Sequence, residues 1–415
     1  MFFPQQVLRN PEKISYANVI DYPNSVLILS CGQANIFAAN FSWWHRRLAC
    51  AAPAKACGYQ SNICMQLGIK DCLAEPMPAS RENPESTLSN SAPSALSEPL
   101  LEVRDLRCHF RLAGAWGGGQ TLKAVDQVSF RLFAGETLGL VGESGCGKST
   151  LARLVLDLLK PTRGEVRFAG ADVHRLTGPR RQAFKRQMQI IFQDPYSSLN
   201  PRMTVRRMLE EPFAIHGLGR RTERQRWVEE LLAEVGLGPE HLDRYPHEFS
   251  GGQRQRLGIA RALALRPRLI VADEPVSALD VSIQAQILNL LTHLQERYGL
   301  TYLFISHDLS VISQISTRIA VMYLGRLVDL APRAVWERGG LHPYAEALLA
   351  AIPLPDPGRP FRPPQLKGEP PSPIQIPSGC PFHPRCPEAQ LPRCRDETPE
   401  FRQTSPEHWV ACHFR

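Results

Sequence analysis

Nine consecutive residues combine glycine, lysine and hydroxyl side chains at a spacing suited to holding phosphate groups. They match the pattern G-x-x-x-x-G-K-[ST], in which glycines let successive backbone N–H groups face one phosphate. The lysine adds a full positive charge for the β- and γ-phosphates, and the next hydroxyl is placed to ligate Mg²⁺. The sequence therefore predicts a nucleoside triphosphate site formed by Gly142, Glu143, Ser144, Gly145, Cys146, Gly147, Lys148, Ser149 and Thr150.

Two adjacent carboxylates, Asp273 and Glu274, follow the continuous apolar run 269–272. Such a run is typical of a strand buried on both faces, and ligands bind at the carboxyl ends of parallel strands. Asp273 is predicted to hold Mg²⁺ through water. Glu274 is predicted to polarise the attacking water as general base.

A second phosphate contact is indicated where Ser250, Gly251, Gly252 and Gln253 precede the helical stretch 254–265. The free N–H groups at a helix N-terminus attract anions. The same residues would also serve as an ordinary N-cap, and this stretch alone leaves both interpretations open.

The elements around these motifs alternate between strand and helix, as in an α/β nucleotide-binding domain. The phosphate loop joins an expected strand at 136–142 to an expected helix at 149–159, where apolar residues recur at helical spacing. Further strands are expected at 100–106, 125–132, 269–272 and 302–305, and a helical insert including 224–235 is expected between residues 193 and 250.

The domain organisation is read from composition and pattern. Residues 1–76 are irregular and are not expected to belong to the working protein, because ordered pattern begins near residue 100 and Met77 offers an alternative start. Residues 77–96 are rich in Ser, Pro and Glu and indicate a disordered linker. The nucleotide-binding domain is assigned to residues 97–345. Residues 346–415 form a tail in which proline is dense over 353–377.

Charge and hydropathy narrow the class of partner. The net charge is +8, but basic and acidic residues are interspersed, so we expect no nucleic acid partner and a surface compatible with an anionic membrane leaflet. The apolar runs are far shorter than the 18 or more residues that a spanning helix needs, so we expect no membrane span.

The order of motifs resembles the nucleotide-binding subunit of ABC transporters over residues 97–345. The matching motifs are the phosphate loop, Gln193 in Ile-Phe-Gln-Asp-Pro, the signature 250–253, Asp273-Glu274, the run 277–280 ending at Asp280, and His307. The resemblance implies a P-loop ABC-type α/β fold. It would have a RecA-like core, an antiparallel β subdomain, a helical subdomain at about 194–255, and a cysteine-containing tail.

In that family two ATP molecules lie between two such domains, and the phosphate loop of one faces the signature of the other. The resemblance implies that the signature 250–253 serves the partner's ATP and that Asp280 contributes to nucleotide binding. Gln193 would ligate Mg²⁺ and report the γ-phosphate to the helical insert. His307 would hold the attacking water together with Glu274. Phe110 fits the family's adenine-stacking aromatic; Trp116 and a purely structural role for Phe110 are the alternatives.

Two segments, residues 193–201 and Leu341-His-Pro-Tyr344, resemble one group within this family, the ATPases of dipeptide, oligopeptide and nickel importers. Gly145-Cys-Gly147 resembles the second of two ATPase types in that group. This implies a related, non-identical ATPase partner, two transmembrane permease subunits and an external solute-binding protein. It also implies a peripheral location on the cytoplasmic face of the inner membrane.

The 11 cysteines include four in the tail, Cys380, Cys386, Cys394 and Cys412. A cytosolic ATPase is not expected to carry structural disulfides. The spacing of the four is similar to the cluster that binds a [4Fe–4S] centre in some family members, and four thiolates can surround such a centre. Structural zinc usually takes a close C-x₂₋₄-C pair, which this tail lacks. Zinc and free or oxidised thiols stay open as alternatives.

The sequence thus predicts an ATP-binding and ATP-hydrolysing subunit that energises import of di- or oligopeptides or a related small solute. The alternatives are an exporter ATPase and a soluble ABC ATPase that acts in translation or DNA repair. The single ATPase unit, the missing heptad insert and the importer-type tail favour the importer.

Overall fold

The computed structural model describes residues 26–31, 34–39, 98–112, 119–336, 338–352, 366 and 368–415. The chain divides into two units, residues 1–89 and residues 90–415. In the first unit, strands β1 (Val26–Cys31) and β2 (Ala34–Ala39) pair antiparallel. The expected linker at 77–96 and most of the expected extension at 1–76 lie outside the described residues.

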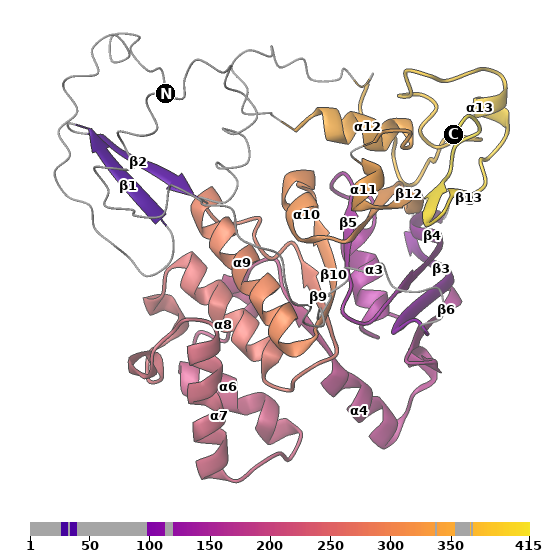
Figure 1. Ribbon diagram of the computed structural model, residues 1–415. Helices are drawn as coiled ribbons and strands as arrows, with labels where there is room; N and C mark the ends of the chain where they lie inside the picture. The colour runs from indigo at the N-terminus through magenta and orange to yellow at the C-terminus, as the bar shows by residue number, and fades with distance from the viewer. Residues whose placement is uncertain are drawn as a thin grey trace, which may run out of the picture. The chain divides into compact units, whose positions relative to one another are not determined.

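An eight-stranded sheet forms the frame of the second unit (Figure 1). Its central strands are parallel neighbours, and the three strands at one edge run antiparallel. In spatial order the strands are β13 (Arg402–Ser405), β14 (His408–Val410), β12 (Arg326–Pro332), β11 (Arg318–Tyr323), β5 (Thr137–Val141), β10 (Thr301–Ser306), β9 (Leu269–Asp273) and β8 (Met188–Ile191).

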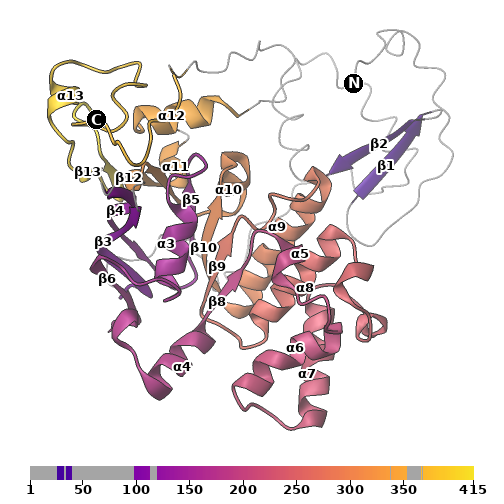
Figure 2. The same cartoon turned by 180° about the vertical axis from the view of Figure 1, so that it is seen from behind.

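A second, antiparallel sheet accompanies it, with the order β4 (Gln120–Leu132), β3 (Leu101–Leu112), β6 (Arg163–Phe168) and β7 (Ala171–Asp172). Helix α3 (Lys148–Val155) contacts β4 on one side and β9 on the other. Leucine and valine side chains of α3, β3, β4 and β9 share one buried cluster. This packing places the start of α3 between the two sheets, as Figures 1 and 2 show.

The remaining helices lie around the sheets and in the tail (Figure 2). Helices α5 (Pro195–Ser198), α6 (Val205–Ile215) and α7 (Arg221–Glu234) precede α8 (Gly251–Leu263) and pack on it or on one another. The others are α4 (Gly178–Gln187), α9 (Val281–Tyr298), α10 (Leu309–Ile315), α11 (Arg333–Trp336), α12 (Pro343–Ala350) and α13 (Arg393–Asp396), with one-turn 3₁₀ helices at Val173–Arg175, Pro239–His241 and Pro246–Glu248.

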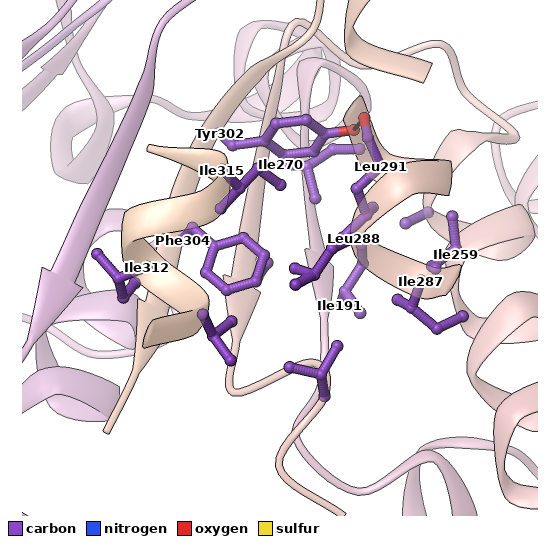
Figure 3. Close-up of a cluster of buried hydrophobic side chains, with 14 of the residues drawn as sticks. Ile191, Ile259, Ile270, Ile287, Leu288, Leu291, Tyr302, Phe304, Ile312 and Ile315 are labelled. Carbon is purple, nitrogen blue, oxygen red and sulfur yellow. Dashed lines mark hydrogen bonds between the residues drawn. The ribbon is translucent and has the colours of Figure 1, made fainter. Parts of the chain in front are cut away.

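The other face of the large sheet is covered by α8, α9 and α10. Figure 3 shows Tyr302 and Phe304 of β10 lying between Leu288 and Leu291 of α9 and Ile312 of α10. The Tyr302 hydroxyl donates to the Leu291 carbonyl at 3.1 Å, so its one polar atom is satisfied inside the core. With apolar cores on both faces, the central strands can be continuously hydrophobic, as their sequences indicated.

The structure confirms the predicted fold class. The strands expected at 269–272 and 302–305 are β9 and β10, and the helix expected at 224–235 is α7. The helix expected to run to residue 159 instead ends at Val155. Asp157 has a positive φ of 53°, which turns the chain out of the helix. Its buried carboxylate accepts from Arg181 at 2.8 Å. Within the described residues, no helix is both long enough and apolar enough to cross a bilayer.

Candidate nucleotide site

The phosphate loop connects β5 to α3 and adopts a conformation that needs glycine at two points. A Cβ on Gly142 would lie 2.2 Å from the Met322 carbonyl oxygen, and one on Gly147 would lie 2.0 Å from that of Ala124. Gly147 also has a φ of 111°. These glycines let the loop pack against β11 and β4 and still turn into the helix. Ser144, Gly145 and Cys146 form the turn, and Thr150 lies in the first turn of α3.

Lys148 lies at the centre of this loop. Its Nζ donates to the carbonyl oxygens of Gly142 at 2.7 Å and Glu143 at 3.0 Å, and the residue is only 5% exposed. The ammonium group therefore rests on carbonyl dipoles inside the loop. Because its partners are neutral, a phosphate oxygen can replace them with a stronger, charge-assisted contact.

Two of the three predicted Mg²⁺ ligands, Ser149 and Asp273, are in contact, whereas the third, Gln193, contacts Glu274. The Ser149 hydroxyl donates to Asp273 Oδ1 at 3.2 Å, joining the start of α3 to the end of β9. Burial raises the pKa of the Asp273 carboxyl, the neighbouring Glu274 charge adds to the rise, and the Ser149 hydrogen bond opposes it. A hydroxyl and a carboxylate side by side are oxygen donors of the kind Mg²⁺ takes.

Glu274 is held by two side chains from neighbouring strands. Gln193 Nε2 donates to Glu274 Oε2 at 2.8 Å, and His307 Nδ1 lies 3.1 Å from the same oxygen. Gln193 follows β8, Glu274 follows β9 and His307 follows β10, so the three side chains meet at the carboxyl ends of adjacent parallel strands. Glu274 has a φ of 48°, a left-handed conformation that is uncommon outside glycine and that turns its side chain out of the strand.

The signature forms the N-terminus of α8. Ser250 Oγ accepts from the Gln253 N–H at 3.3 Å, and Gln253 Oε1 accepts from the Ser250 N–H at 3.1 Å. This is a capping box, so the N-cap interpretation is confirmed. Ser250 and Gly251 are also exposed, as a surface that meets a second subunit requires. Asp280 is exposed at the N-cap of α9.

The adenine side of the site is less complete. Phe110 lies on β3 opposite Leu122 of β4 and is 37% exposed, so it is not a core residue. Two residues further along β4, the Ala124 carbonyl faces Gly147 of the phosphate loop. Strand β4 thus contacts the phosphate loop two residues from the pairing partner of Phe110. Trp116, the alternative, lies outside the described residues.

The tail reaches the phosphate loop, which the sequence did not suggest. Arg385 Nη1 and Nη2 each donate to the Glu143 carboxylate at 2.9 Å. The Glu143 N–H donates to the hydroxyl of Tyr344 at 3.0 Å. Glu143 is an unspecified position of the phosphate-binding pattern, and Arg385 is 242 residues away, so no spacing rule links them. The only signal was the Leu-His-Pro-Tyr344 motif, which had no assigned role.

The four tail cysteines line one small cavity of about 20 Å³. Cys380 and Cys394 are buried, and Cys386 and Cys412 are half-buried, all as free thiols. Burial raises the pKa of Cys380 and of Cys386 to about 11. Within the described part of the chain, however, no three or more His, Cys, Asp or Glu side chains are arranged to hold a metal ion. The structure therefore gathers the thiols but does not show the expected iron–sulfur site.

A cavity away from the phosphate loop lies among the helices. It has a volume of about 600 Å³ and is lined by residues of α6, α7 and the end of α8, including Phe213 and Trp227. A nucleotide site shared between two subunits would be open on one side in a single subunit. The phosphate loop, the Ser149–Asp273 pair and Glu274 therefore identify the site, and the size of a cavity does not.

Comparison with known proteins agrees with this geometry. Residues 125–277 match the ABC transporter family, and residues 332–394 match the oligopeptide/dipeptide transporter C-terminal region. The chain is 54% identical over 319 residues to the putative oligopeptide transport ATP-binding protein YkfD of Bacillus subtilis, covering 76% of this chain and 95% of that protein. It is 52% identical over 326 residues to the oligopeptide transport ATP-binding protein AppF of the same organism, covering 77% and 99%.

The fold is also similar to solved structures. The ATP-binding cassette MJ0796, determined as a dimer in a post-hydrolysis state bound to ADP and Pi, aligns with a TM-score of 0.51 and 29% sequence identity. The alignment covers 56% of this chain and 98% of that one.

Proposed function

The chain belongs to the ATP-binding subunits of ABC transporters, and on that basis we propose that it energises the import of di- or oligopeptides. It is an ATPase of that family. The observation that supports ATP hydrolysis is the arrangement at the ends of β8, β9 and β10, where Gln193 and His307 contact Glu274 next to the Ser149–Asp273 pair. The match of residues 332–394 to the oligopeptide/dipeptide transporter C-terminal region supports peptide import.

Each residue has a proposed role. Lys148 and the N–H groups of residues 144–149 bind the β- and γ-phosphates. Ser149 and Gln193 would hold Mg²⁺, with Asp273 acting through water; the bound ion would neutralise charge on the phosphates. Glu274 is the general base for the attacking water, which His307 helps to position.

The partner composition and location are also proposals. The exposed N-terminus of α8 supports a second ATPase subunit whose ATP would meet Ser250, Gly251, Gly252 and Gln253. We propose that this partner is a related chain, and that both act on two permease subunits fed by an external solute-binding protein. The subunit would lie on the cytoplasmic face of the inner membrane. We also propose the boundaries 97–345 for the ATPase domain and 346–415 for the tail.

The tail distinguishes the importer from the main alternative. A soluble ABC ATPase of translation or DNA repair has no need of a transporter-specific region. Residues 332–394 match that of oligopeptide and dipeptide transporters, and this favours the importer.

Peptide uptake tests the proposal directly. Cells that lack the native chain receive either the wild-type chain or Glu274→Gln, and uptake of labelled di- and oligopeptides is measured. We expect uptake with the wild type and its loss with Glu274→Gln. The matched control is Glu229→Gln, which changes an exposed glutamate on α7 in the same way and should keep uptake. No gain in uptake with the wild type over cells that lack the chain would reject peptide import and make nickel or another small solute the next candidate. Uptake restored equally by wild type and Glu274→Gln would instead remove Glu274 from its role.

We also propose that the four tail cysteines bind a [4Fe–4S] centre. The four side chains line one cavity, which supports this proposal. Four thiolates suit a [4Fe–4S] centre, although the side chains would have to turn toward one another to bind it. The full chain, purified without oxygen, should contain iron and acid-labile sulfide and absorb visible light. Cys394→Ser should abolish all three signals, whereas Cys108→Ser, on the buried β3, should not. Zinc in place of iron, or no metal at all, would reject the proposal.

A further inference from the structure

The tail contacts the phosphate loop through an ion pair between a buried arginine, Arg385, and a half-buried glutamate, Glu143. Arg385 is only 6% exposed, and its fork meets both oxygens of Glu143, at 2.9 Å each. A bidentate arginine–carboxylate pair fixes orientation as well as distance. Glu143 directly follows Gly142, the first glycine of the loop, so the ion pair is made by a residue of the phosphate loop itself.

The backbone of Glu143 is held as well. Its N–H donates to the Tyr344 hydroxyl, and its carbonyl oxygen accepts from Lys148 Nζ at 3.0 Å. Tyr344 is fully buried against Tyr323 and Phe382, with ring centroids 4.8 and 5.3 Å away. One residue of the loop therefore connects the tail to the lysine that faces the phosphates.

Charge gives this contact a direct consequence for nucleotide binding. Glu143 is a carboxylate within a loop built to receive a polyanion, and an unpaired negative charge there would repel the phosphates. Among the described residues, Arg385 is the one side chain that forms an ion pair with this carboxylate, and it is close enough to neutralise it. Removing the guanidinium group would thus oppose phosphate binding even if the loop kept its shape.

The segment that carries Arg385 is the turn between Cys380 and Cys386. The Arg385 N–H donates to the Phe382 carbonyl at 3.0 Å, and the Cys380 N–H donates to the Cys394 carbonyl at 2.8 Å. The position of the guanidinium group therefore depends on the packing of the cysteine-rich tail.

We propose that Arg385 is a positioning residue for the ATPase: it neutralises Glu143 and, with Tyr344, holds the phosphate loop ready for nucleotide. The tail is then a working part of the nucleotide site. This inference rests on the proposed role of residues 142–150 as the phosphate site.

The test is Arg385→Gln in the full chain, with the Kd and KM for MgATP, kcat at saturating ATP and the Tm measured together. Losing a charge-assisted contact predicts an increase of about tenfold in Kd and KM, with kcat changed far less. Arg385→Lys keeps the charge and should recover most of the affinity. Tyr344→Phe keeps the ring packing and loses only the hydroxyl, so we expect an increase of about threefold.

A second substitution separates a direct role from damage to the fold. Adding Glu143→Gln to Arg385→Gln removes the unpaired charge, so the double variant should bind ATP more tightly than Arg385→Gln alone. Arg395→Gln is the matched control, because Arg395 and Asp396 form an exposed pair of the same kind, with contacts of 2.8 and 3.2 Å. It should keep the wild-type KM.

Lys148→Ala separates failure of the Arg385 inference from failure of the phosphate-site assignment itself. Lys148→Ala should abolish ATP binding; if it does not, the phosphate site itself is wrongly placed. If Lys148→Ala abolishes binding while Arg385→Gln lowers Tm but keeps the KM of the Arg395→Gln control, Arg385 is only structural and the inference is rejected. The inference is also rejected if the double variant binds ATP no better than Arg385→Gln.

Discussion

Among individual residues, Glu274 is the proposed general base, and two neighbours orient its carboxylate. Gln193 and His307 both contact Oε2. A general base must lie within hydrogen-bond reach of the proton it takes, and orientation by two neighbours restricts it to one direction.

Glu274→Gln should retain ATP binding and lose turnover, because the amide keeps the shape of the side chain but cannot accept a proton. Loss of a general base predicts a fall in kcat of about 10²- to 10⁴-fold. Steady-state phosphate release and equilibrium ATP binding would measure both quantities. Turnover close to that of the Glu229→Gln control would remove Glu274 from its role.

The residues proposed to contact the nucleotide could be identified from the sequence because they lie in short motifs whose spacing reflects local geometry. The contacts of Glu143 with Arg385 and Tyr344 could not, since they join residues far apart in the chain through packing of the tail. Asp157 is a similar case. It has a left-handed backbone just after α3, which ends four residues before the helix end that the apolar spacing predicted, and its carboxylate contacts Arg181, 24 residues away.

Between neighbouring elements, the contact of β4 with the β11–β12 turn holds the two sheets together beside the phosphate loop. Arg326 Nη2 donates to Asp126 Oδ2 at 2.7 Å, and the Asp126 N–H donates to the Gly325 carbonyl at 2.8 Å. Burial alone would raise the pKa of Asp126, but hydrogen bonding and charge from Arg326, with help from Lys123 and His109, bring it below the usual value.

Asp126→Asn should therefore lower the free energy of unfolding by about 1–3 kcal/mol at neutral pH, because the Arg326 guanidinium loses its carboxylate partner. Because the folded-state pKa of Asp126 is depressed, this contribution is present above the ordinary aspartate value, about pH 4, and is lost as the pH falls below it. Urea unfolding at several pH values measures the difference. Asp243→Asn, which breaks an exposed pair with Arg206, should change the unfolding free energy by less than about 0.5 kcal/mol at every pH. An Asp126→Asn effect as small as this would reject the prediction.

The buried central strands could be predicted from the sequence, whereas the short strands at the edge of the sheet could not. Continuous apolar runs identified β9 and β10, because a strand that is buried on both faces has apolar residues at successive positions. Strands β13 and β14 were not predicted. They are only four and three residues long, and the four residues of β13 are all exposed. Pairing of β14 with β12, and of β13 with β14, determines them rather than sequence pattern.

For the assembled subunit, the exposed signature is the feature that points to a second ATPase chain. Ser250 is satisfied within its own capping box yet lies at the surface, where the free N–H groups of α8 can receive an anion from outside the subunit.

Ser250→Glu should prevent ATP-dependent assembly with a second ATPase subunit, because a carboxylate at this helix end would repel the phosphates expected there. The subunit's own ATP binding should remain. Light scattering with and without ATP, in the Glu274→Gln background and with the partner chain present, measures assembly. His293→Glu, which adds the same charge at an exposed position of α9, should assemble normally. Assembly of the Ser250→Glu variant would place the interface elsewhere.

The pairing of β14 with β12 has a practical consequence for solubility. Asp329 and Leu330 of β12 are aligned with Val410 and Trp409, and the Ala411 N–H donates to the Val328 carbonyl at 2.9 Å. A chain shortened to end before residue 402 would leave the edge of a largely buried strand uncovered, and such edges recruit other chains into aggregates. Residues 402–415 thus cover the edge of β12 and prevent a strand of another molecule from pairing with it. The exposed side chains of β13 are polar.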